Sequence, residues 1–212
     1  MNDAEKVWHP SVIAPEAERT LVGLRQHSIL SDFYLAGGTG LALQLGHRRS
    51  IDLDFFSSKG FDEDALLRQV ERLPDVSSVE KNKHTLHASI QGTKVSFLGG
   101  YDYPLLFPLG TFQQVSVADA RDIACMKITT LMSRGKKRDF IDAYAASREY
   151  GLKTLIGLFE QKYARTHYNP EHVLKSLTYF DDAEGDPMPE MLVQLSWEES
   201  KQFFRKAAPP LR

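Results

Sequence analysis

The chain has 212 residues, of which 42% are hydrophobic and 25% charged, and its formal net charge is −2 at pH 7. A chain of this size and apolar content can bury a core without disulfides or structural metal ions. It would form one medium domain or one domain with an appendage. The small net charge excludes a strongly basic, histone-like nucleic-acid binder, although a local basic patch stays compatible with it. Cys125 is the only cysteine, which excludes an intrachain disulfide and fits a reducing cytosol.

The N-terminus "MNDAEKVWHP" has no apolar segment of the kind found in secretion signals. No run of the sequence approaches the ~18 consecutive apolar residues that a membrane span requires. No internal repeat or low-complexity tract is visible either. We therefore expect a cytoplasmic protein that makes no contact with a membrane.

The first half of the chain mixes helical and strand patterns. Residues 15–26 predict a helix that begins at Pro15, and "FYLAGG" predicts a short strand ended by glycines. A helix is expected over 39–45 and another over "FDEDALLRQVERL", where Asp62 is the expected N-cap. Alternating apolar residues predict strands at "IDLDFF", "VSSVEKN", "HTLHASI" and "TKVSFL", and "QGTK" predicts a hairpin between the last two.

After Val117 the pattern becomes helical. Five amphipathic segments follow, which are "ADARDIACMKITTLMSRG", "KRDFIDAYAASREY", "LKTLIGLFEQKYAR", "PEHVLKSLTYF" and "WEESKQFFRKAA". The segment "DDAEGDPMPE" is the most linker-like. The prediction is an α+β protein, with a mixed-sheet core over residues 1–115 and a helical region over 116–212 that packs on the core.

Two carboxylates stand out in "IDLDFF". In a strand, residues two apart point to the same face with Cα atoms roughly 6.5 Å apart, so Asp52 and Asp54 should project together. Ile51, Leu53 and Phe55 should then point into the core. Two aligned carboxylates on an apolar strand repel each other, and a divalent cation such as Mg²⁺ removes that conflict. The alternative is a solvent-facing side of the strand whose acids pair with Arg or Lys, because short motifs match often.

The residues before the acid pair fit a phosphate site. Gly37 and Gly38 lie between an expected strand and helix, where backbone N–H groups can face an anion without a Cβ in the way. Thr39 could contact a phosphate or cap the helix. Arg48 and Arg49 follow the helix, where basic residues also favour the helix dipole. The order of anion cradle, basic residues and acid pair indicates a nucleotide together with a metal.

These motifs resemble a known family. The string G-G-T-x-L-A-L-x-L-G-H-R-x-S-x-D-L-D-F-F resembles the opening motif of the nucleotidyltransferase superfamily. The wording "GHRRSIDLDFF", with "ADARDIACMKI" and "RGKKRDFIDAYA" further on, is similar to the AbiEii-type nucleotidyltransferase toxins of bacterial toxin–antitoxin and phage-defence systems. The resemblance covers about residues 33–146.

The resemblance implies a polymerase-β-like mixed sheet that carries the acid pair, with a helical half closing over it. It also implies transfer of a nucleotide from an NTP to an acceptor hydroxyl, at an RNA (tRNA) 3′ end or on a protein, in a toxin that an antitoxin controls. By the same resemblance Asp52 and Asp54 would bind Mg²⁺, or alternatively Mn²⁺. The triphosphate ligands would be Gly37, Gly38, Thr39, Arg48, Arg49 and Lys127, and Asp139 would be a further catalytic acid.

Several of these residues have a structural alternative. Lys127 could be a solvated residue on a helix face, and Asp139 could favour a helix dipole, with Asp142 a surface acid. The cluster Arg134, Lys136, Lys137 and Arg138 fits a solvated loop or a phosphate or RNA contact equally well.

A third carboxylate, which many nucleotidyltransferases carry on a later core strand, has no evident counterpart here. The expected strand reads "TKVSFLGG", with Ser96 where an acid would stand and Asp102 nearby in a Tyr/Pro segment. Without that acid, the base role could fall to solvent or to Asp139. The main hypothesis is a Mg²⁺-dependent nucleotidyltransferase, and its rivals are a degenerate nucleotide-binding module, a phosphoester hydrolase and a purely structural domain.

Overall fold

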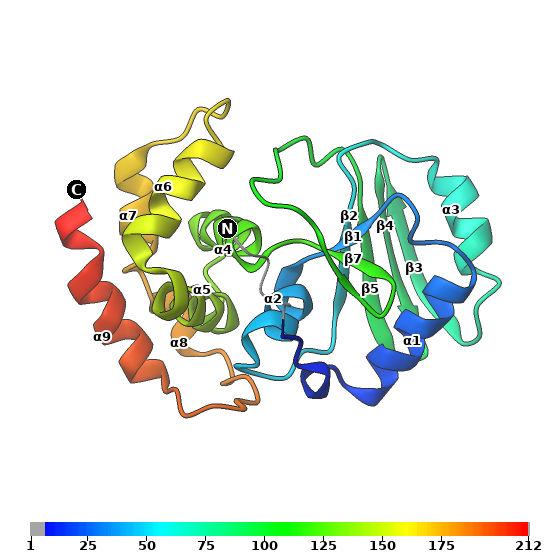
Figure 1. Ribbon diagram of the computed structural model, residues 1–212, viewed down its shortest axis with the longest axis horizontal. Coiled ribbons are helices and arrows are strands. Elements are labelled where there is room, and N and C mark those ends of the chain that lie inside the picture. The colour runs from blue at the N-terminus through cyan, green and yellow to red at the C-terminus, as the bar shows by residue number, and fades with distance from the viewer. Residues whose placement is uncertain (1–6, 212) are drawn as a thin grey trace.

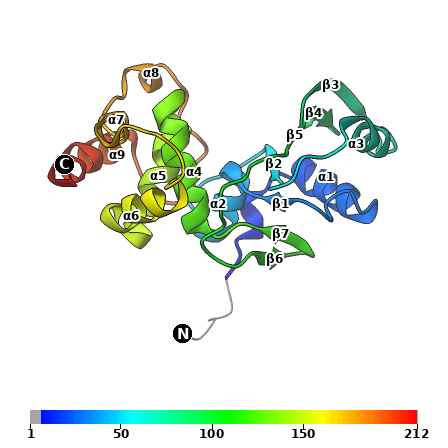
Figure 2. The same ribbon diagram turned by 90° about the horizontal axis from the view of Figure 1, so that it is seen from above.

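The computed structural model describes residues 7–211. A mixed sheet with helices on both faces lies beside a group of helices from the second half of the chain (Figures 1 and 2). No helix within the described range is long and apolar enough to cross a membrane. The fold is therefore the expected α+β arrangement, with its sheet and its C-terminal helices in contact through α2 and α4.

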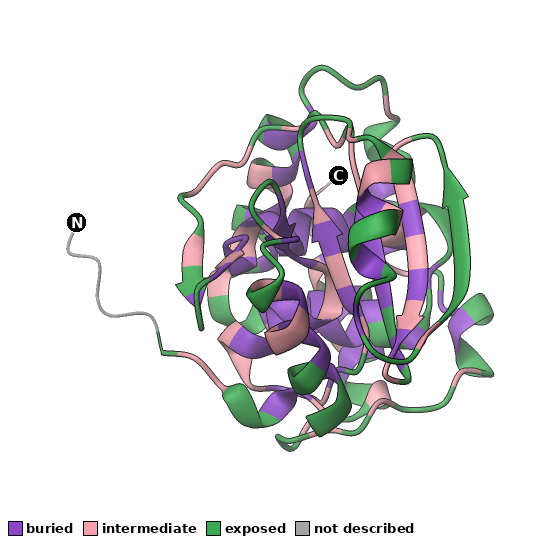
Figure 3. Cartoon of the chain, turned by 90° about the vertical axis from the view of Figure 1, so that its right-hand side faces the viewer, coloured by how far each residue is buried: buried purple, intermediate pink, exposed green. Residues whose placement is uncertain are grey.

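The sheet has seven strands in the order β3-β4-β5-β2-β1-β7-β6. At its centre β2 pairs parallel to β5 and antiparallel to β1, and β1 pairs parallel to β7. β3, β4 and β5 form an antiparallel meander, with β3 exposed at the edge (Figure 3). The bounds are β1 (Tyr34–Leu35), β2 (Leu53–Phe56), β3 (Val76–Asn82), β4 (Thr85–Ile90), β5 (Thr93–Leu98), β6 (Gly110–Phe112) and β7 (Val115–Val117).

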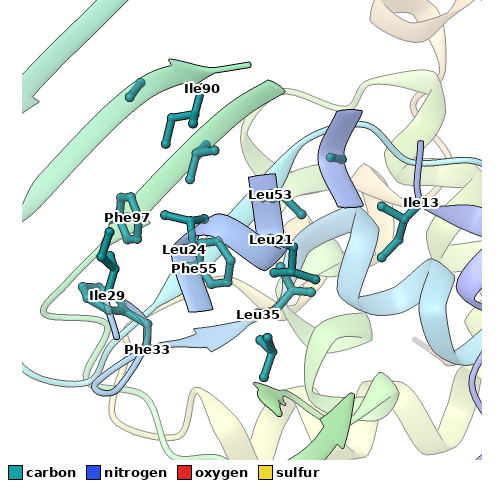
Figure 4. Close-up of a cluster of buried hydrophobic side chains, with 14 of the residues drawn as sticks. Ile13, Leu21, Leu24, Ile29, Phe33, Leu35, Leu53, Phe55, Ile90 and Phe97 are labelled. Atoms are coloured by element: carbon teal, nitrogen blue, oxygen red, sulfur yellow. The ribbon is translucent and has the colours of Figure 1, made fainter. Parts of the chain in front are cut away.

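One face of the sheet carries the main core. The helices α1 (Pro15–Gln26) and α3 (Glu63–Val70) cover this face, and a short 3-10 turn, η1 (Pro10–Val12), precedes α1. Leu21 and Leu24 of α1 pack with Phe55 and Phe97 of the strands, all fully buried (Figure 4). The apolar residues of β2 and β5 alternate with residues of the opposite face, so one set fills the core and the other set is left for the site.

The opposite face meets α2 (Gly37–Leu45) and the helical half. α4 (Ala120–Ser133) packs against α2 on one side and against α5 (Lys137–Tyr150) and α6 (Leu152–Lys162) on the other. α9 (Trp197–Ala207) packs on α5. The remaining elements are α7 (Pro170–Ser176), α8 (Asp181–Glu184) and η2 (Pro209–Leu211).

Most predicted elements are present. The helix over 15–26 and the strands "VSSVEKN" and "TKVSFL" have the predicted bounds, and Asp62 caps α3 by accepting from the Ala65 N–H. The β6–β7 hairpin was not predicted, because each of its strands has only three residues.

The prediction that Ile51 points into the core is wrong. β2 begins only at Leu53, and the Ile51 side chain is 62% exposed. The preceding residue, Ser50, donates its N–H to the Val12 carbonyl and forms a bridge with Ile13, which fixes the chain before the strand begins.

A buried ion pair attaches the Tyr/Pro loop after β5 to the helices. Lys162 of α6 and Asp122 of α4 are both fully buried, with Nζ 2.8 Å from Oδ1. The Asp122 carboxylate also accepts the backbone N–H groups of Leu106 and Phe107, and Lys162 donates to the Pro104 carbonyl at 2.7 Å. The loop therefore depends on this pair for its position.

Replacing Lys162 with Met should destabilise the protein strongly. The change leaves the Asp122 carboxylate buried without its cation, and removing one member of a buried pair costs about 3–5 kcal/mol. Urea unfolding measures the loss. Lys175→Met is the matched control, because the Lys175 side chain is 67% exposed and its pairing with Glu171 should contribute little. Equal effects of the two changes would contradict this role.

Candidate functional site

Asp52 and Asp54 line a single cavity of about 410 Å³. Asp54 lies within β2 and Asp52 immediately before it, and both are half-buried while Leu53 and Phe55 are fully buried. The acids therefore project from the sheet face opposite to the main core. This is the arrangement that the alternation in "IDLDFF" predicted for the two carboxylates.

The glycine pair leaves room for the acid strand and a basic side chain. Gly37 has φ +60°, and a Cβ built on it would lie 2.5 Å from Asp54 Oδ2. A Cβ on Gly38 would lie 2.5 Å from a terminal nitrogen of Arg48. Both residues belong to the first turn of α2, whose N–H groups have no partner within the helix. Only glycine at these positions lets the start of the helix approach the acids this closely.

Thr39 is buried beneath the acids. Its hydroxyl lies 2.8 Å from Ser50 Oγ and forms a hydrogen bond with the Asp52 carbonyl. These contacts hold the segment that carries Asp52. The phosphate contact predicted for Thr39 stays a prediction, and the contacts in the structure give this residue a positioning role.

A buried ionic network lies directly behind the cavity, centred on Asp142 of α5. Arg48 donates to both carboxylate oxygens of Asp142, from Nε at 2.7 Å and from Nη2 at 2.8 Å. His47 Nε2 lies 2.8 Å from Asp142 Oδ1, and Lys127 Nζ lies 2.7 Å from Oδ2. Asp142 is fully buried, so it is not the surface acid that the sequence allowed.

The network keeps Asp142, Arg48 and Lys127 charged despite their burial. Burial alone would raise the pKa of Asp142, but Arg48 and Lys127, with hydrogen bonds from His47 and Arg48, hold it well below its ordinary value. Burial alone would lower the pKa values of Arg48 and Lys127, and the carboxylates of Asp142 and Asp139 reverse this and raise both. The mutual charges therefore outweigh desolvation at each of these three positions.

Lys127 connects this network to the cavity. Its ammonium lies 2.8 Å from Asp139 Oδ1 and also contacts Asp142, and the side chain lines the cavity. An ammonium has three N–H groups, so two carboxylates leave one for a group in the cavity. Asp139 itself is fully buried and does not line the cavity. Asp139 therefore holds the Lys127 ammonium, and its own carboxylate does not face the cavity.

Cationic side chains form the remaining charged wall of the cavity. Arg134 and Arg138 are exposed and line it, and Arg138 lies 3.4 Å from the Asp52 carboxylate. Arg49 lines it too and pairs with Glu190 at 2.6 Å. Lys137, which the sequence grouped with these arginines, is instead buried and donates to the Glu184 carbonyl. Of the four predicted basic residues, two line the cavity, Lys137 is structural, and Lys136 is exposed outside the cavity lining.

The neighbouring strand offers a hydroxyl where a third acid would stand. Ser96 of β5 pairs in register with Asp54 of β2, so the two side chains share a face of the sheet. Asp102, the other candidate, pairs with Arg165 at 3.2 Å and lines a different hollow of about 600 Å³. That hollow is larger, but its two acids, Asp32 and Asp102, come from separate loops and not from one strand segment, so the chemistry favours the cavity at Asp52 and Asp54.

The donor set fits Mg²⁺. Asp52 and Asp54 offer oxygen ligands, and both half-buried side chains line the cavity. Across residues 7–211 no three His, Cys, Asp or Glu side chains gather in a way that could hold a metal ion. Mg²⁺ is commonly bound by one or two carboxylates together with substrate phosphates, which matches a site of this kind.

Comparison with known sequences settles the family. The description "Nucleotidyl transferase AbiEii toxin, Type IV TA system" belongs to a family profile that matches residues 19–111 and 98–211. The chain belongs to the AbiEii nucleotidyltransferase toxin family. An uncharacterised protein of Aquifex aeolicus is 39% identical over 188 residues, which span 84% of this chain and 87% of that protein.

Solved structures share the fold of this AbiEii protein. A candidate nucleotidyltransferase from H. pylori superposes with a TM-score of 0.56 at 18% identity, over 93% of this chain and 95% of that chain. MenT4, a nucleotidyltransferase toxin from Mycobacterium tuberculosis, gives a TM-score of 0.54 at 16% identity, over 94% and 87% of the two chains. Both likenesses extend over the sheet and the helical half, so the nucleotidyltransferase fold applies to the whole architecture.

Asp142→Asn should reduce the stability of the fold, and the stability of the variant should fall less steeply at acid pH than that of the wild type. The folded-state pKa of Asp142 lies below that of the unfolded chain, so its charge stabilises the fold above about pH 4. That contribution is lost as the pH falls through this value toward the folded-state pKa. Urea unfolding between pH 3 and 7 should show a smaller decline for the variant than for the wild type. Parallel curves would contradict this assignment.

Gly37→Ala should disable the site at a modest cost in stability. The new methyl group would collide with the Asp54 carboxylate, and the left-handed backbone adds about 1 kcal/mol of strain. Thermal unfolding and an assay of nucleotidyl transfer measure the two effects. Gly157→Ala in α6 is the matched control, because nothing lies within 4 Å of its added Cβ and alanine favours a helix. Full activity of Gly37→Ala would show that the close approach is dispensable.

Proposed function

We propose that this AbiEii protein is a Mg²⁺-dependent transferase that moves a nucleoside monophosphate from an NTP to a hydroxyl at an RNA 3′ end. The observation that carries the proposal is the cavity itself. It places two metal-type carboxylates, Asp52 and Asp54, against the first turn of α2 and in one cavity with Lys127, Arg134 and Arg138. A triphosphate with its cation needs both halves of this arrangement.

Each group has a distinct role in the proposed reaction. When bound on Asp52 and Asp54, Mg²⁺ would neutralise charge on the triphosphate. The N–H groups at the start of α2 and the free N–H of Lys127 would hold phosphate oxygens. Arg134 and Arg138, both exposed, would face the charge that builds on the leaving group. Holding phosphates and acceptor in line accounts for most of the acceleration in such reactions.

The covalent step is a displacement at the α-phosphorus. The acceptor oxygen forms a bond to this phosphorus as the bond to the β-phosphate oxygen breaks, and pyrophosphate leaves. The proton of the acceptor hydroxyl passes to water, because Ser96 replaces a third acid beside Asp54 and Asp139 is buried behind Lys127. Glu190, the remaining carboxylate of the cavity, is paired with Arg49 at 2.6 Å.

RNA is the proposed acceptor because the cations at the cavity mouth suit a phosphate backbone. Arg134 and Arg138 are exposed beside the acids, and Lys136 is exposed between them in sequence. Phosphate contacts by Arg and Lys supply most of the sequence-independent affinity for nucleic acids. The family of this chain also suggests an antitoxin as its regulatory partner.

A second candidate is a nucleotide-binding module with little or no transfer. Ser96 favours it, because the position beside Asp54 lacks a carboxylate that would activate the acceptor. This candidate predicts Mg²⁺-dependent NTP binding without release of pyrophosphate. The transferase predicts NTP binding together with release of pyrophosphate.

Asp52→Asn and Asp54→Asn should each reduce transfer by at least about 100-fold, because each removes one of the two proposed metal ligands. Release of pyrophosphate and labelling of total tRNA by each α-labelled NTP with Mg²⁺ measure the step. Asp102→Asn is the matched control, since this exposed acid lies in the other hollow and should leave transfer unchanged. Binding of NTP by the wild type without any product would select the second candidate.

A further inference from the structure

The segment 186–191, here called the proline strap, forms one wall of the cavity. It lies between α8 and α9 and runs beside the connection between α2 and β2 (Figure 1). Pro187, Met188, Pro189 and Glu190 all line the cavity. The sequence "DPMPE" resembles a plain linker, and neither the family motifs nor the acid pair involve it.

Hydrogen bonds fix the strap at both ends. At its start, Asp186 accepts the backbone N–H of Lys137 at 3.0 Å and the Lys137 ammonium binds the Asp186 carbonyl. At its end, the Glu190 carbonyl accepts the Arg49 N–H at 2.9 Å, and Met191 forms an antiparallel bridge with Arg48. Two prolines restrict the backbone between these ends. The strap is therefore a held wall and not a free linker.

The cavity is lined by both charged and apolar side chains. Its charged residues are the acid pair, Lys127, the arginines and Glu190, and its apolar side chains are Ile51, Pro187, Met188 and Pro189. Ile51 is 62% exposed and Met188 is 39% exposed. The two residues are more than 100 positions apart in sequence and line the same cavity. Single exposed apolar residues are ordinary, but an apolar wall within a charged cavity is suited to a ligand with both characters.

We infer that the proline strap and Ile51 form the subsite for the base of the NTP, with Met188 against the face of the base. The inference rests on the proposed function, because it takes the triphosphate to lie at the acids and cations. A nucleoside triphosphate combines a polyanion with a flat aromatic ring, and this cavity provides complementary surfaces for both. A methionine thioether packs favourably on aromatic rings and adapts to their shape. Met188 then determines how strongly the base, as opposed to the phosphates, contributes to binding.

Binding of NTPs and of inorganic tripolyphosphate tests this division. Isothermal titration with Mg²⁺ compares each of the four NTPs with tripolyphosphate, on the wild type and on Met188→Ala. The wild type should bind its preferred NTP more tightly than tripolyphosphate. Met188→Ala should weaken that NTP about tenfold through lost apolar contact, and it should leave tripolyphosphate unchanged.

Two further variants serve as controls. Leu192→Ala removes a similar side chain, 41% exposed, that follows the strap and does not line the cavity, so both affinities should stay at wild-type values. Met188→Leu keeps the apolar surface and should retain most of the NTP affinity. Loss of binding in Leu192→Ala as large as in Met188→Ala would overturn the specific role of Met188.

The remaining outcomes separate the two proposals. If tripolyphosphate binds and Met188→Ala binds the NTP as tightly as the wild type does, the base lies elsewhere and only this inference fails. If the wild type binds the NTP no more tightly than tripolyphosphate, the subsite is likewise overturned while the phosphate site stands. If neither ligand binds with Mg²⁺, the proposed function fails, and this inference fails with it.

Discussion

The site depends on the buried ion pairs that the Asp142 carboxylate forms. Asp142 lies on α5 in the helical half, yet its partners Arg48 and His47 follow α2 in the sheet half, and Lys127 comes from α4. The charges of Asp142, Arg48 and Lys127 would each be costly to bury alone, and together they compensate one another. The two halves of the chain are therefore joined by an ionic centre immediately behind the cavity. Shifting either half would leave a buried charge without its partner.

This centre also explains how the cavity acquires its chemistry. Arg48, held by Asp142, occupies the space above Gly38 that a larger residue would need, and Lys127 reaches the cavity between two buried carboxylates. Thr39 fixes the Asp52 segment from below. The acid pair thus faces groups that are held by buried residues outside the cavity lining, such as Asp139 and Asp142. Preorganised charge of this kind is what phosphoryl chemistry requires.

The cavity is completed by a segment from the far end of the chain. The proline strap follows α8 and is hydrogen-bonded to Arg49 and Lys137, so the last third of the sequence closes the site that the first third begins. The helical half is therefore part of the nucleotide site in this proposal, and the sheet supplies the acids. In this proposal the substrates lie at the junction of the two halves.

The sequence by itself determined the features that arise from local patterns. Strand alternation placed Asp52 and Asp54 together, helix periodicity and caps located α1 and α3, and ordered motifs indicated the family that the comparisons confirm. Only the tertiary structure decided the buried state of Asp142, the exposure of Ile51 and the wall formed by Met188. Each of these depends on partners that lie far away in sequence, such as Arg48 and Asp142, which are 94 positions apart. Local patterns contain no record of such pairings, because burial and charge compensation exist only once the chain has packed.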